Sequence, residues 1–259
     1  MITPRVERVI KIGGRVQRDS RLAPVLAQLW LEAPGSFCVV HGGGEIISSL
    51  QTRLGREPRF VAGRRLTTND DIEVLRMALS GAANKQLVGY LSTEGIAAVG
   101  LSGEDGSLIV ARVLDAERFG QVGVPVGVNE GVLCALLAGG YLPVISPLAR
   151  DYESTSGGAL NVNADDAAAA IAHAMGADEL LLVSDVPGVV VDGIAAATLS
   201  SDEAAQAIEN GIATEGMATK LRAALDALRR GVPAVRIGGL DALLDPTLGT
   251  TLLATPQLA

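Results

Sequence analysis

Aromatic residues are scarce in this chain: they make up only 3% of its 259 residues, whereas hydrophobic residues make up 48%. The apolar content is ample for one large domain or two tightly fused lobes. The core must be built mainly from Ala, Val, Leu and Ile, because there are too few aromatic rings to fill it. Such a core suits helices packed on a parallel sheet.

Cysteine and histidine are also rare, with two residues of each type. Cys38 and Cys134 both lie in apolar stretches, so we expect two buried, reduced thiols in a cytosolic protein. His41 and His173 are far from each other in the sequence. The chain therefore offers no zinc-type ligand cluster.

Long apolar runs and runs of like charge are absent as well. No apolar stretch reaches the roughly 18 residues of a membrane-spanning helix, and the N-terminal sequence lacks the apolar segment of a signal peptide. The net charge of −8 would repel phosphates, which argues against a nucleic-acid or anionic-membrane partner. We expect a soluble, cytoplasmic protein in which local cations bind a small anion.

Short apolar, β-branched runs alternate with longer Ala- and Leu-rich segments along the chain. This alternation predicts an α/β fold around a mostly parallel sheet. The expected strands are 8–12, 36–40, 96–101, 141–146, 179–184 and 232–237. The expected helices are 20–33, 44–54, 69–93, 129–139, 164–175, 201–210 and 216–230. The expected hairpins and loops at the edge of the sheet are 57–66, 105–127 and 147–161.

Two glycine turns follow the first two expected strands. The strand 8–12 contains Lys11 and is followed by Gly13–Gly14, and the next strand is followed by His41 and Gly42–Gly44. Backbone N–H groups at the start of a helix bind anions, and glycines let an oxyanion come close. Neither turn matches a Walker A or GxGxxG pattern. Each alone is typical of a tight turn, and together they favour an anion site beyond the carboxyl ends of the strands.

Charged side chains near these turns have both an ordinary and a functional interpretation. Lys11 is either an edge-strand lysine that reaches water or a buried cation aimed at the ligand end of its strand. Lys220 follows Gly216 by one turn of an expected helix, where a surface lysine is the ordinary case. Arg64 and Arg65 are either solvated loop residues or, beside a glycine-lined pocket, a source of one bidentate contact to a carboxylate.

The segment "LNVNADD" opens an Ala-rich helix with a cluster of polar residues. Asn163 is expected to cap that helix. Capping does not explain the rest of the cluster, which comprises Asn161, Asp165 and Asp166. Asp165, near the helix start, could orient two ammonium groups.

Polar residues also mark two other loops. Thr68 or Asn69 is expected to cap the helix that follows the two arginines. In "VSDVPGVV", Ser184 and Asp185 lie between a strand and a Pro-Gly turn, a position that suits purine or ribose contacts. The inventory contains cations and two backbone anion sites, but no histidine base and no motif for a nucleophilic Cys or Ser. It favours phosphoryl transfer, in which positioning and charge neutralisation do most of the work.

The segments "KIGG", "VVHGGG", "GRRLT", "NVNAD", "SDVPGV" and "EGMATK" occur in the order found in the amino acid kinase family. The chain resembles that family from Lys11 to the closing "LGTTLL" (248–253), and most resembles the branch that phosphorylates N-acetyl-L-glutamate with ATP in arginine biosynthesis. The resemblance implies a three-layer αβα sandwich with a mostly parallel central sheet. It also implies an acyl-amino-acid lobe at about 1–147 and an ATP lobe at about 148–259.

The resemblance further implies a role for each motif residue. The catalytic set would comprise two lysines that stabilise the moving phosphoryl group, a carboxylate that holds them in register and two backbone N–H donors: Lys11, Lys220, Asp165, Gly14 and Gly44. The acyl-amino acid would be bound by Gly43, Gly44, Asn161 and, on its α-carboxylate, Arg65. The nucleotide site would be lined by Ser184, Asp185, Val186, Pro187, Gly188, Val189, Val190, Ile212, Ala213, Thr214 and Met217. Mg²⁺ would arrive as MgATP, held chiefly by phosphates rather than by protein side chains. His41 would hold its turn rather than act as a base.

Assembly and regulation follow from departures from the family pattern. Arginine-inhibited members carry an extra N-terminal helix, whereas only ten residues precede Lys11 here, so we expect an arginine-insensitive homodimer. The segment "VVVDGIAAATLS" is short, which predicts a shortened hairpin over ATP.

Three alternatives remain open. The substrate could be N-succinylglutamate, which differs only in its acyl group. It could instead be aminoadipate or glutamate on an acidic carrier protein, although a net charge of −8 argues against the basic docking face that this requires. The chain could also be a non-catalytic ligand sensor with the same fold, although both lysines and Asp165 are present.

Overall fold

A computed structural model describes residues 6–191, 193–213 and 215–255. Within them, ten strands form a continuous hydrogen-bonded order: β13 (Thr198–Ser200), β15 (Thr250–Leu253), β14 (Ala234–Gly238), β10 (Glu179–Val183), β1 (Arg8–Ile12), β2 (Phe37–His41), β8 (Leu142–Asp151), β6 (Ile109–Val113), β7 (Val122–Val128) and β9 (Ala159–Val162). An eleventh strand, β5 (Ala98–Gly103), pairs with β8. Most pairs are parallel, and the antiparallel ones are β14–β15, β6–β7 and β8–β9. The expected mostly parallel sheet is confirmed.

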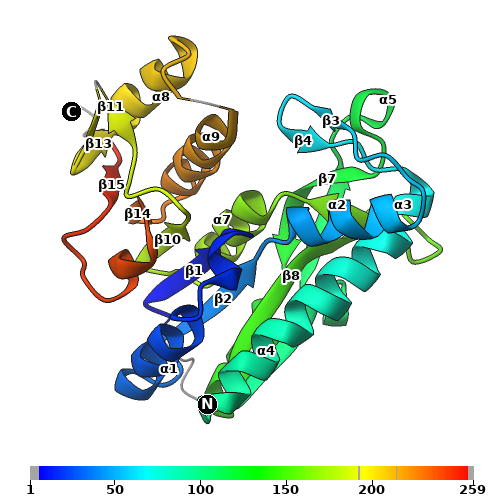
Figure 1. The fold of residues 1–259 in the computed structure, drawn as a ribbon, viewed down its shortest axis with the longest axis horizontal. Coiled ribbons are helices and arrows are strands. Elements are labelled where there is room, and N and C mark those ends of the chain that lie inside the picture. Colours follow the sequence, from blue (N-terminus) through cyan, green and yellow to red (C-terminus); the bar gives the residue numbers. More distant parts are fainter. Residues whose placement is uncertain (1–5, 192, 214, 256–259) are drawn as a thin grey trace.

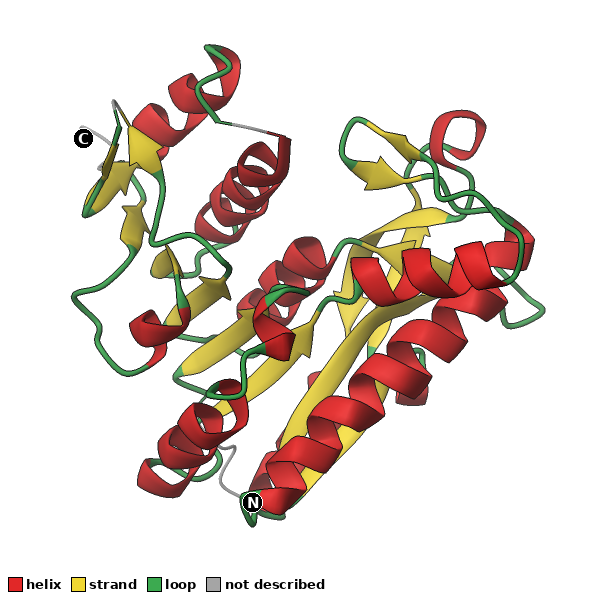
Figure 2. Ribbon diagram, viewed as in Figure 1, coloured by secondary structure: helices red, strands yellow, loops and turns green. Residues whose placement is uncertain are grey.

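Helices cover both faces of this sheet (Figures 1 and 2). They are α1 (Leu22–Glu32), α2 (Gly44–Arg53), α3 (Asn69–Leu75), α4 (Asn84–Thr93), α5 (Ala116–Phe119), α6 (Glu130–Ala138), α7 (Ala164–Ala174), α8 (Ser201–Glu209) and α9 (Glu215–Arg229). The crossover from β1 to β2 and the crossover from β10 to β14 run in opposite directions along the sheet. Right-handed crossovers therefore place α1 and α9 on opposite faces. α4 packs beside α1, and α7 packs beside α9, which completes the three layers.

Short elements complete the chain. The hairpins are β3 (Phe60–Val61) with β4 (Arg64–Arg65), and β11 (Val190–Val191) with β12 (Ile194–Ala195). The 3₁₀ turns are η1 (Val16–Arg18), η3 (Asp105–Ser107) and η4 (Leu240–Leu243), and η2 (Arg76–Ala83) is a π-helix. The strands of the β11–β12 hairpin have two residues each, and the shortening of this hairpin over ATP stays a prediction.

The core is aliphatic, as the composition predicts, with Ala, Val, Leu and Ile making up most of its buried residues. Trp30 and Phe37 add an edge-to-face ring pair with centroids 5.4 Å apart. Cys38 is fully buried in β2, and burial raises the pKa of its thiol to about 12. Cys134 differs from the expectation, because its place on the outer part of α6 leaves it half-buried.

The structure departs from the predicted elements mainly at the edges of the sheet. The strand expected at 141–146 continues to Asp151 as β8, and β9 returns antiparallel beside it within 147–161, where hairpins and loops were expected. Strands β13 and β15 were not predicted. The long helix expected at 69–93 is present but contains the π-helical η2.

The topology places a ligand crevice at the carboxyl ends of β1 and β10, where the strand order reverses direction. The division into two lobes near residue 147 stays a prediction; β9 pairs with β7 and β8, so a boundary between β9 and β10 would suit the pairing better. Among the described residues, no helix combines the length and the apolar character needed to cross a bilayer.

Candidate active site

The two glycine turns predicted from the sequence lie against each other at the carboxyl ends of β1 and β2. The Gly42 N–H donates to the carbonyl oxygen of Ile12, at the end of β1, at 3.0 Å. A Cβ added to Gly14 would lie 3.8 Å from the backbone nitrogens of both Gly43 and Gly44. The N–H groups expected to bind a transferred phosphoryl group are thus gathered in one place.

A buried carboxylate joins the two predicted lysines. Lys11, in β1, has its Nζ 2.7 Å from Asp165 Oδ1, and Lys220, in α9, has its Nζ 3.8 Å from Asp165 Oδ2. Burial opposes ionisation of Asp165, but the charges of Lys11 and Lys220 outweigh it and keep the pKa of Asp165 below its usual value. Burial and the nearby Lys11 together lower the pKa of Lys220. Two ammonium groups are therefore brought to one carboxylate, a concentration of positive charge suited to a polyphosphate.

Helix α7 positions that carboxylate through its first turn. Asn163 caps the helix as predicted, accepting from the backbone N–H groups of Asp165 at 2.8 Å and Asp166 at 3.4 Å. Asp166 forms an ion pair with Arg64 at 2.9 Å, a partnership that the sequence did not indicate. Burial raises the pKa of Asp166 in spite of Arg64.

Arg65 is buried and held by one face of α2. Its Nη1 donates to Gln51 Oε1 at 2.5 Å, and its Nη2 donates to the Gly44 carbonyl oxygen at 2.9 Å and to Ser48 Oγ at 2.8 Å. Gly44, Ser48 and Gln51 follow the i, i+4, i+7 spacing of one helical face, which is the signal that could have identified them. The Phe60 ring lies 4.7 Å from the guanidinium carbon. Burial lowers the pKa of Arg65, and the nearby charge of Asp71 opposes this.

Two hollows lie beside these groups, and both are lined by Gly44, Phe60 and Arg65. One of about 190 Å³ is lined by Gly43, Gly44, Arg65 and Asn161, the residues expected to bind the acyl-amino acid. Another of about 470 Å³ is lined by Gly14, Gly44 and Arg65, among others. Asn161 is oriented by a hydrogen bond from its Nδ2 to Thr67 Oγ1 at 2.9 Å.

His41 is fully buried at the end of β2. Its Nδ1 lies 2.8 Å from the Gly42 carbonyl oxygen, which agrees with the turn-holding role expected for it. Burial lowers its pKa to about 4, and the charge of Lys85 acts in the same direction while the bond to Gly42 opposes it. The imidazole is therefore neutral near pH 7.

The first predicted nucleotide segment forms a loop after β10. Ser184 is buried and its N–H donates to the Gly238 carbonyl oxygen at 2.8 Å, while its Oγ has no hydrogen-bond partner among the described residues. Asp185 forms an ion pair with Arg15, the residue after the first glycine turn. Val186, Pro187 and Gly188 form the turn that leads to Val189 and Val190.

The second predicted nucleotide segment precedes and enters α9. Ile212 is exposed, and the Ala213 N–H donates to the Ala207 carbonyl oxygen at 3.0 Å. Met217 packs against the core. Thr214 lies outside the described residues.

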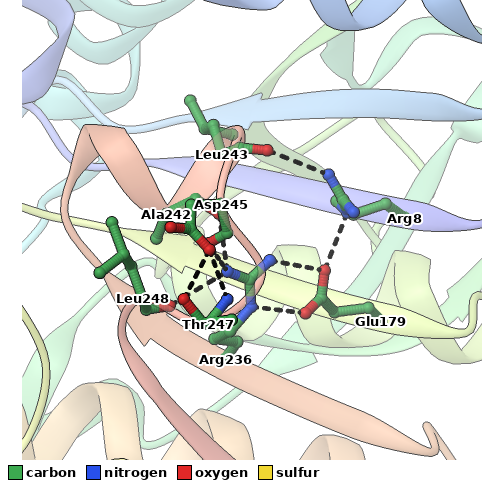
Figure 3. A network of polar contacts seen from close by, with 8 residues as sticks. All are labelled: Arg8, Glu179, Arg236, Ala242, Leu243, Asp245, Thr247 and Leu248. Carbon is green, nitrogen blue, oxygen red and sulfur yellow. Dashed lines mark hydrogen bonds and ion pairs between the residues drawn. The ribbon is translucent and has the colours of Figure 1, made fainter.

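The predicted nucleotide loop is held by hydrogen bonds that the sequence did not indicate. The Val189 N–H donates to Thr250 Oγ1 at 2.8 Å, and that hydroxyl donates to the Ala196 carbonyl oxygen at 2.5 Å. The segment before Thr250 is held by Arg236, which is buried in β14 and pairs with Glu179 (Figure 3). Its Nη1 also donates to three carbonyl oxygens of that segment, those of Ala242, Asp245 and Leu248.

Comparisons with known proteins agree with this geometry. A model described as the amino acid kinase family matches residues 7–239. Proteins named acetylglutamate kinase are 42% identical in Methanopyrus kandleri (92% of this chain and 96% of the relative covered) and 41% identical in Roseiflexus castenholzii (96% and 95%). A third, from Geobacillus kaustophilus, is 40% identical, with 88% of each chain covered.

Solved structures share the fold. A protein from Streptococcus mutans UA159 superposes with a TM-score of 0.85 at 30% identity, covering 96% of this chain and 98% of that one. A carbamate kinase from Giardia lamblia bound to AMP-PNP gives a TM-score of 0.75 at 14% identity, covering 96% and 99%, which is a likeness of fold alone. With its lysines, glycine turns and sheet in this arrangement, the chain belongs to the amino acid kinase family.

Proposed function

We propose that this chain transfers the terminal phosphoryl group of ATP to the side-chain carboxylate of N-acetyl-L-glutamate, which yields N-acetyl-L-glutamyl 5-phosphate. The observation that carries the proposal is the pairing of two lysines with Asp165 beside two facing glycine turns. Three relatives named acetylglutamate kinase, which are 40–42% identical over most of the chain, support the choice of substrate.

The reaction asks little covalent chemistry of the protein. The attacking carboxylate is already ionised near pH 7, so no general base is needed, and neutral, buried His41 need not provide one. Lys11 and Lys220 would neutralise charge on the phosphoryl oxygens, with Asp165 setting their separation. The N–H groups of Gly14 and Gly44 would point at the same oxygens.

The substrates would lie on either side of the lysines. Arg65 would bind the α-carboxylate of acetylglutamate, with Gly43, Gly44 and Asn161 completing that half. Bidentate pairing with a carboxylate suits the planar guanidinium better than it suits an ammonium. ATP would lie along the two nucleotide segments, at Ser184–Val190 and at Ile212–Met217.

Magnesium would reach the site on ATP. No group of three His, Cys, Asp or Glu side chains in the described ranges could hold a metal ion. Asp165 and Asp185 are both paired with cations. These residues fit an ion held mainly by phosphate oxygens, as is usual for Mg²⁺. Bound in that way, it would neutralise charge on the donor phosphates.

A substrate panel tests the proposal. ATP turnover with Mg²⁺ is measured by a coupled assay with acetylglutamate, succinylglutamate and acetylaminoadipate, each with and without arginine. We expect turnover to be fastest with acetylglutamate. Faster turnover with succinylglutamate would show that succinylglutamate, rather than acetylglutamate, is the substrate. Binding of acetylglutamate without its phosphorylation would indicate a ligand sensor.

Assembly, regulation and location are part of the same proposal. The expected homodimer is checked by sedimentation of the assayed sample, and the arginine arm of the panel checks the expected insensitivity to arginine. Use of ATP as the phosphoryl donor is in keeping with the expected cytoplasmic location.

A further inference from the structure

A π-helical segment packs against the glycine turn that follows β2. η2 connects α3 to α4 and packs on α2 and β8. π-helical turns are rare and are often found at functional sites. This one places Leu79 against Gly43, where an added Cβ would lie 2.6 Å from Leu79 Cδ2. The next residue after the π-helix, Asn84, reaches His41.

The Asn84 side chain is fully buried, and its neighbours fix its orientation. Lys85 Nζ donates to Asn84 Oδ1 at 3.0 Å and to the Gly100 carbonyl oxygen at 2.9 Å, so the amide oxygen faces an ammonium group. Asn84 Nδ2 lies 2.9 Å from the Val144 carbonyl oxygen, 3.1 Å from His41 Nε2 and 3.4 Å from the Leu101 carbonyl oxygen. The two shorter contacts take the two amide hydrogens. Because an amide nitrogen only donates, His41 Nε2 must accept, and the imidazole proton is on Nδ1.

That proton points at the glycine turn. The Gly42 carbonyl oxygen lies 2.8 Å from His41 Nδ1 and also accepts from Gln17 Nε2 at 2.8 Å. The Gly42 C=O and the Gly43 N–H belong to one planar trans peptide, in which they point in opposite directions. Two donors on the oxygen therefore fix the direction of the Gly43 N–H. The Gly43 nitrogen lies on the side of the turn near Gly14.

We infer that His41 and Asn84 are positioning residues: acting through the Nδ1–H tautomer, they aim the Gly43 N–H at the point where the acyl-amino acid, already assigned to Gly43, meets the phosphoryl group in transfer. Gly43 would there add a third donor to those of Gly14 and Gly44. The inference rests on the proposed function. Both side chains are fully buried and act through the backbone. A donor that is already aimed stabilises developing charge without reorganisation. A variant in which the Gly42–Gly43 peptide loses a donor to its carbonyl oxygen should therefore lower kcat more than it changes the KM for acetylglutamate.

Two variants of one residue separate the two hydrogen bonds of the imidazole. In His41→Asn, the amide nitrogen lies near the position of Nδ1 and can still donate to Gly42, but the contact with Asn84 is lost. In His41→Gln, the amide oxygen lies near the position of Nε2 and can still accept from Asn84, but the donor to Gly42 is lost. We expect His41→Gln to lower kcat about 10- to 100-fold, and His41→Asn to retain most of it. A role in filling space alone predicts the reverse order, because asparagine leaves the larger cavity.

The tautomer is measured independently, by ¹⁵N NMR of the histidine ring in the wild-type protein at pH 7. We expect a neutral ring with its proton on Nδ1. A proton on Nε2, or a kcat for His41→Gln equal to or above that of His41→Asn, would overturn the inference even though the wild-type enzyme turns over. Wild-type protein without acetylglutamate-dependent turnover would overturn the proposed function instead, so the two failures are distinguishable.

Discussion

The two halves of the candidate site are built differently. On the acyl-amino-acid side, Arg65 and His41 are buried, and each side chain is fixed by more than one hydrogen bond. On the nucleotide side, apolar residues are exposed: Val190 is 48% and Ile212 52% exposed in the two predicted segments, and Ile194, in the hairpin after the first segment, is 74% exposed. The first half is fixed by contacts within the protein, and the second presents exposed apolar surface.

This difference suits the two tasks of a phosphoryl-transfer enzyme. Stabilising charge at the moving group requires fixed donors and cations, because reorganisation during the reaction would cost part of the gain. Binding a large nucleotide tolerates adjustment, because many contacts share the energy. We therefore expect single substitutions to cost most at the lysines and least along the nucleotide hairpin.

The largest expected effect is on Lys220. Lys220→Ala should lower kcat about 100- to 1,000-fold, with a modest change in the KM for acetylglutamate. The fold should survive, because Asp165 keeps its closer partner, Lys11, at 2.7 Å. Steady-state kinetics are compared with those of Arg222→Ala, which removes an exposed charge from the same helix. An unchanged kcat in Lys220→Ala would refute its role at the phosphoryl group.

Acid should lower the free energy of unfolding through His41, which lies in the acyl-amino-acid half. Its pKa is about 4 in the folded protein, below its ordinary 6.5, because of burial and the nearby Lys85. The unfolded chain then binds more protons between these values, so the free energy of unfolding falls as pH drops from 6.5 to 4, by on the order of 3 kcal/mol. Urea unfolding across this range should show a shallower pH dependence in His41→Asn. His173→Asn, at an exposed position, should keep the wild-type slope.

The sequence predicted the centre of this molecule better than its edges. Strands β1, β2 and β10 are short apolar runs buried on both faces, and the Asn163 cap depends only on neighbouring residues, so local patterns sufficed. The end of β8 contains Pro147, Arg150 and Asp151, so the apolar pattern ended the expected strand at residue 146, five residues before the observed end. The π-helical geometry of η2 depends on packing against distant strands, which composition does not encode.

The same limit applies to the candidate site. Lys11, Asp165 and Lys220 lie together as expected. This expectation came from the order of the motifs, which is that of the amino acid kinase family. The partners of Arg65 on α2 could have been found from their helical spacing. The Thr250 support of the nucleotide loop and the Arg64–Asp166 pair join residues 61 and 102 positions apart, and no local pattern indicates them. The roles assigned to these residues remain predictions.

A smaller effect is expected at Arg65. Arg65→Lys keeps the charge but cannot reproduce the fork that contacts Gln51, Ser48 and Gly44. The KM for acetylglutamate should rise about 10- to 100-fold, the equivalent of one hydrogen bond to a charged group, while kcat falls less. Arg64→Lys is the matched control, since its partner is Asp166, and it should leave this KM nearly unchanged. Equal effects of the two variants would contradict the assignment of the α-carboxylate to Arg65.

The smallest effects should lie on the nucleotide side. Thr250→Val keeps the shape of the side chain but leaves the Val189 N–H without its acceptor. The KM for ATP should rise about 3- to 10-fold, the worth of one ordinary hydrogen bond. Ile194→Ser, on the exposed hairpin, should change it even less. If Thr250→Val instead lowers kcat as much as Lys220→Ala does, the nucleotide loop is as critically organised as the glycine turns, and the contrast between the two halves fails.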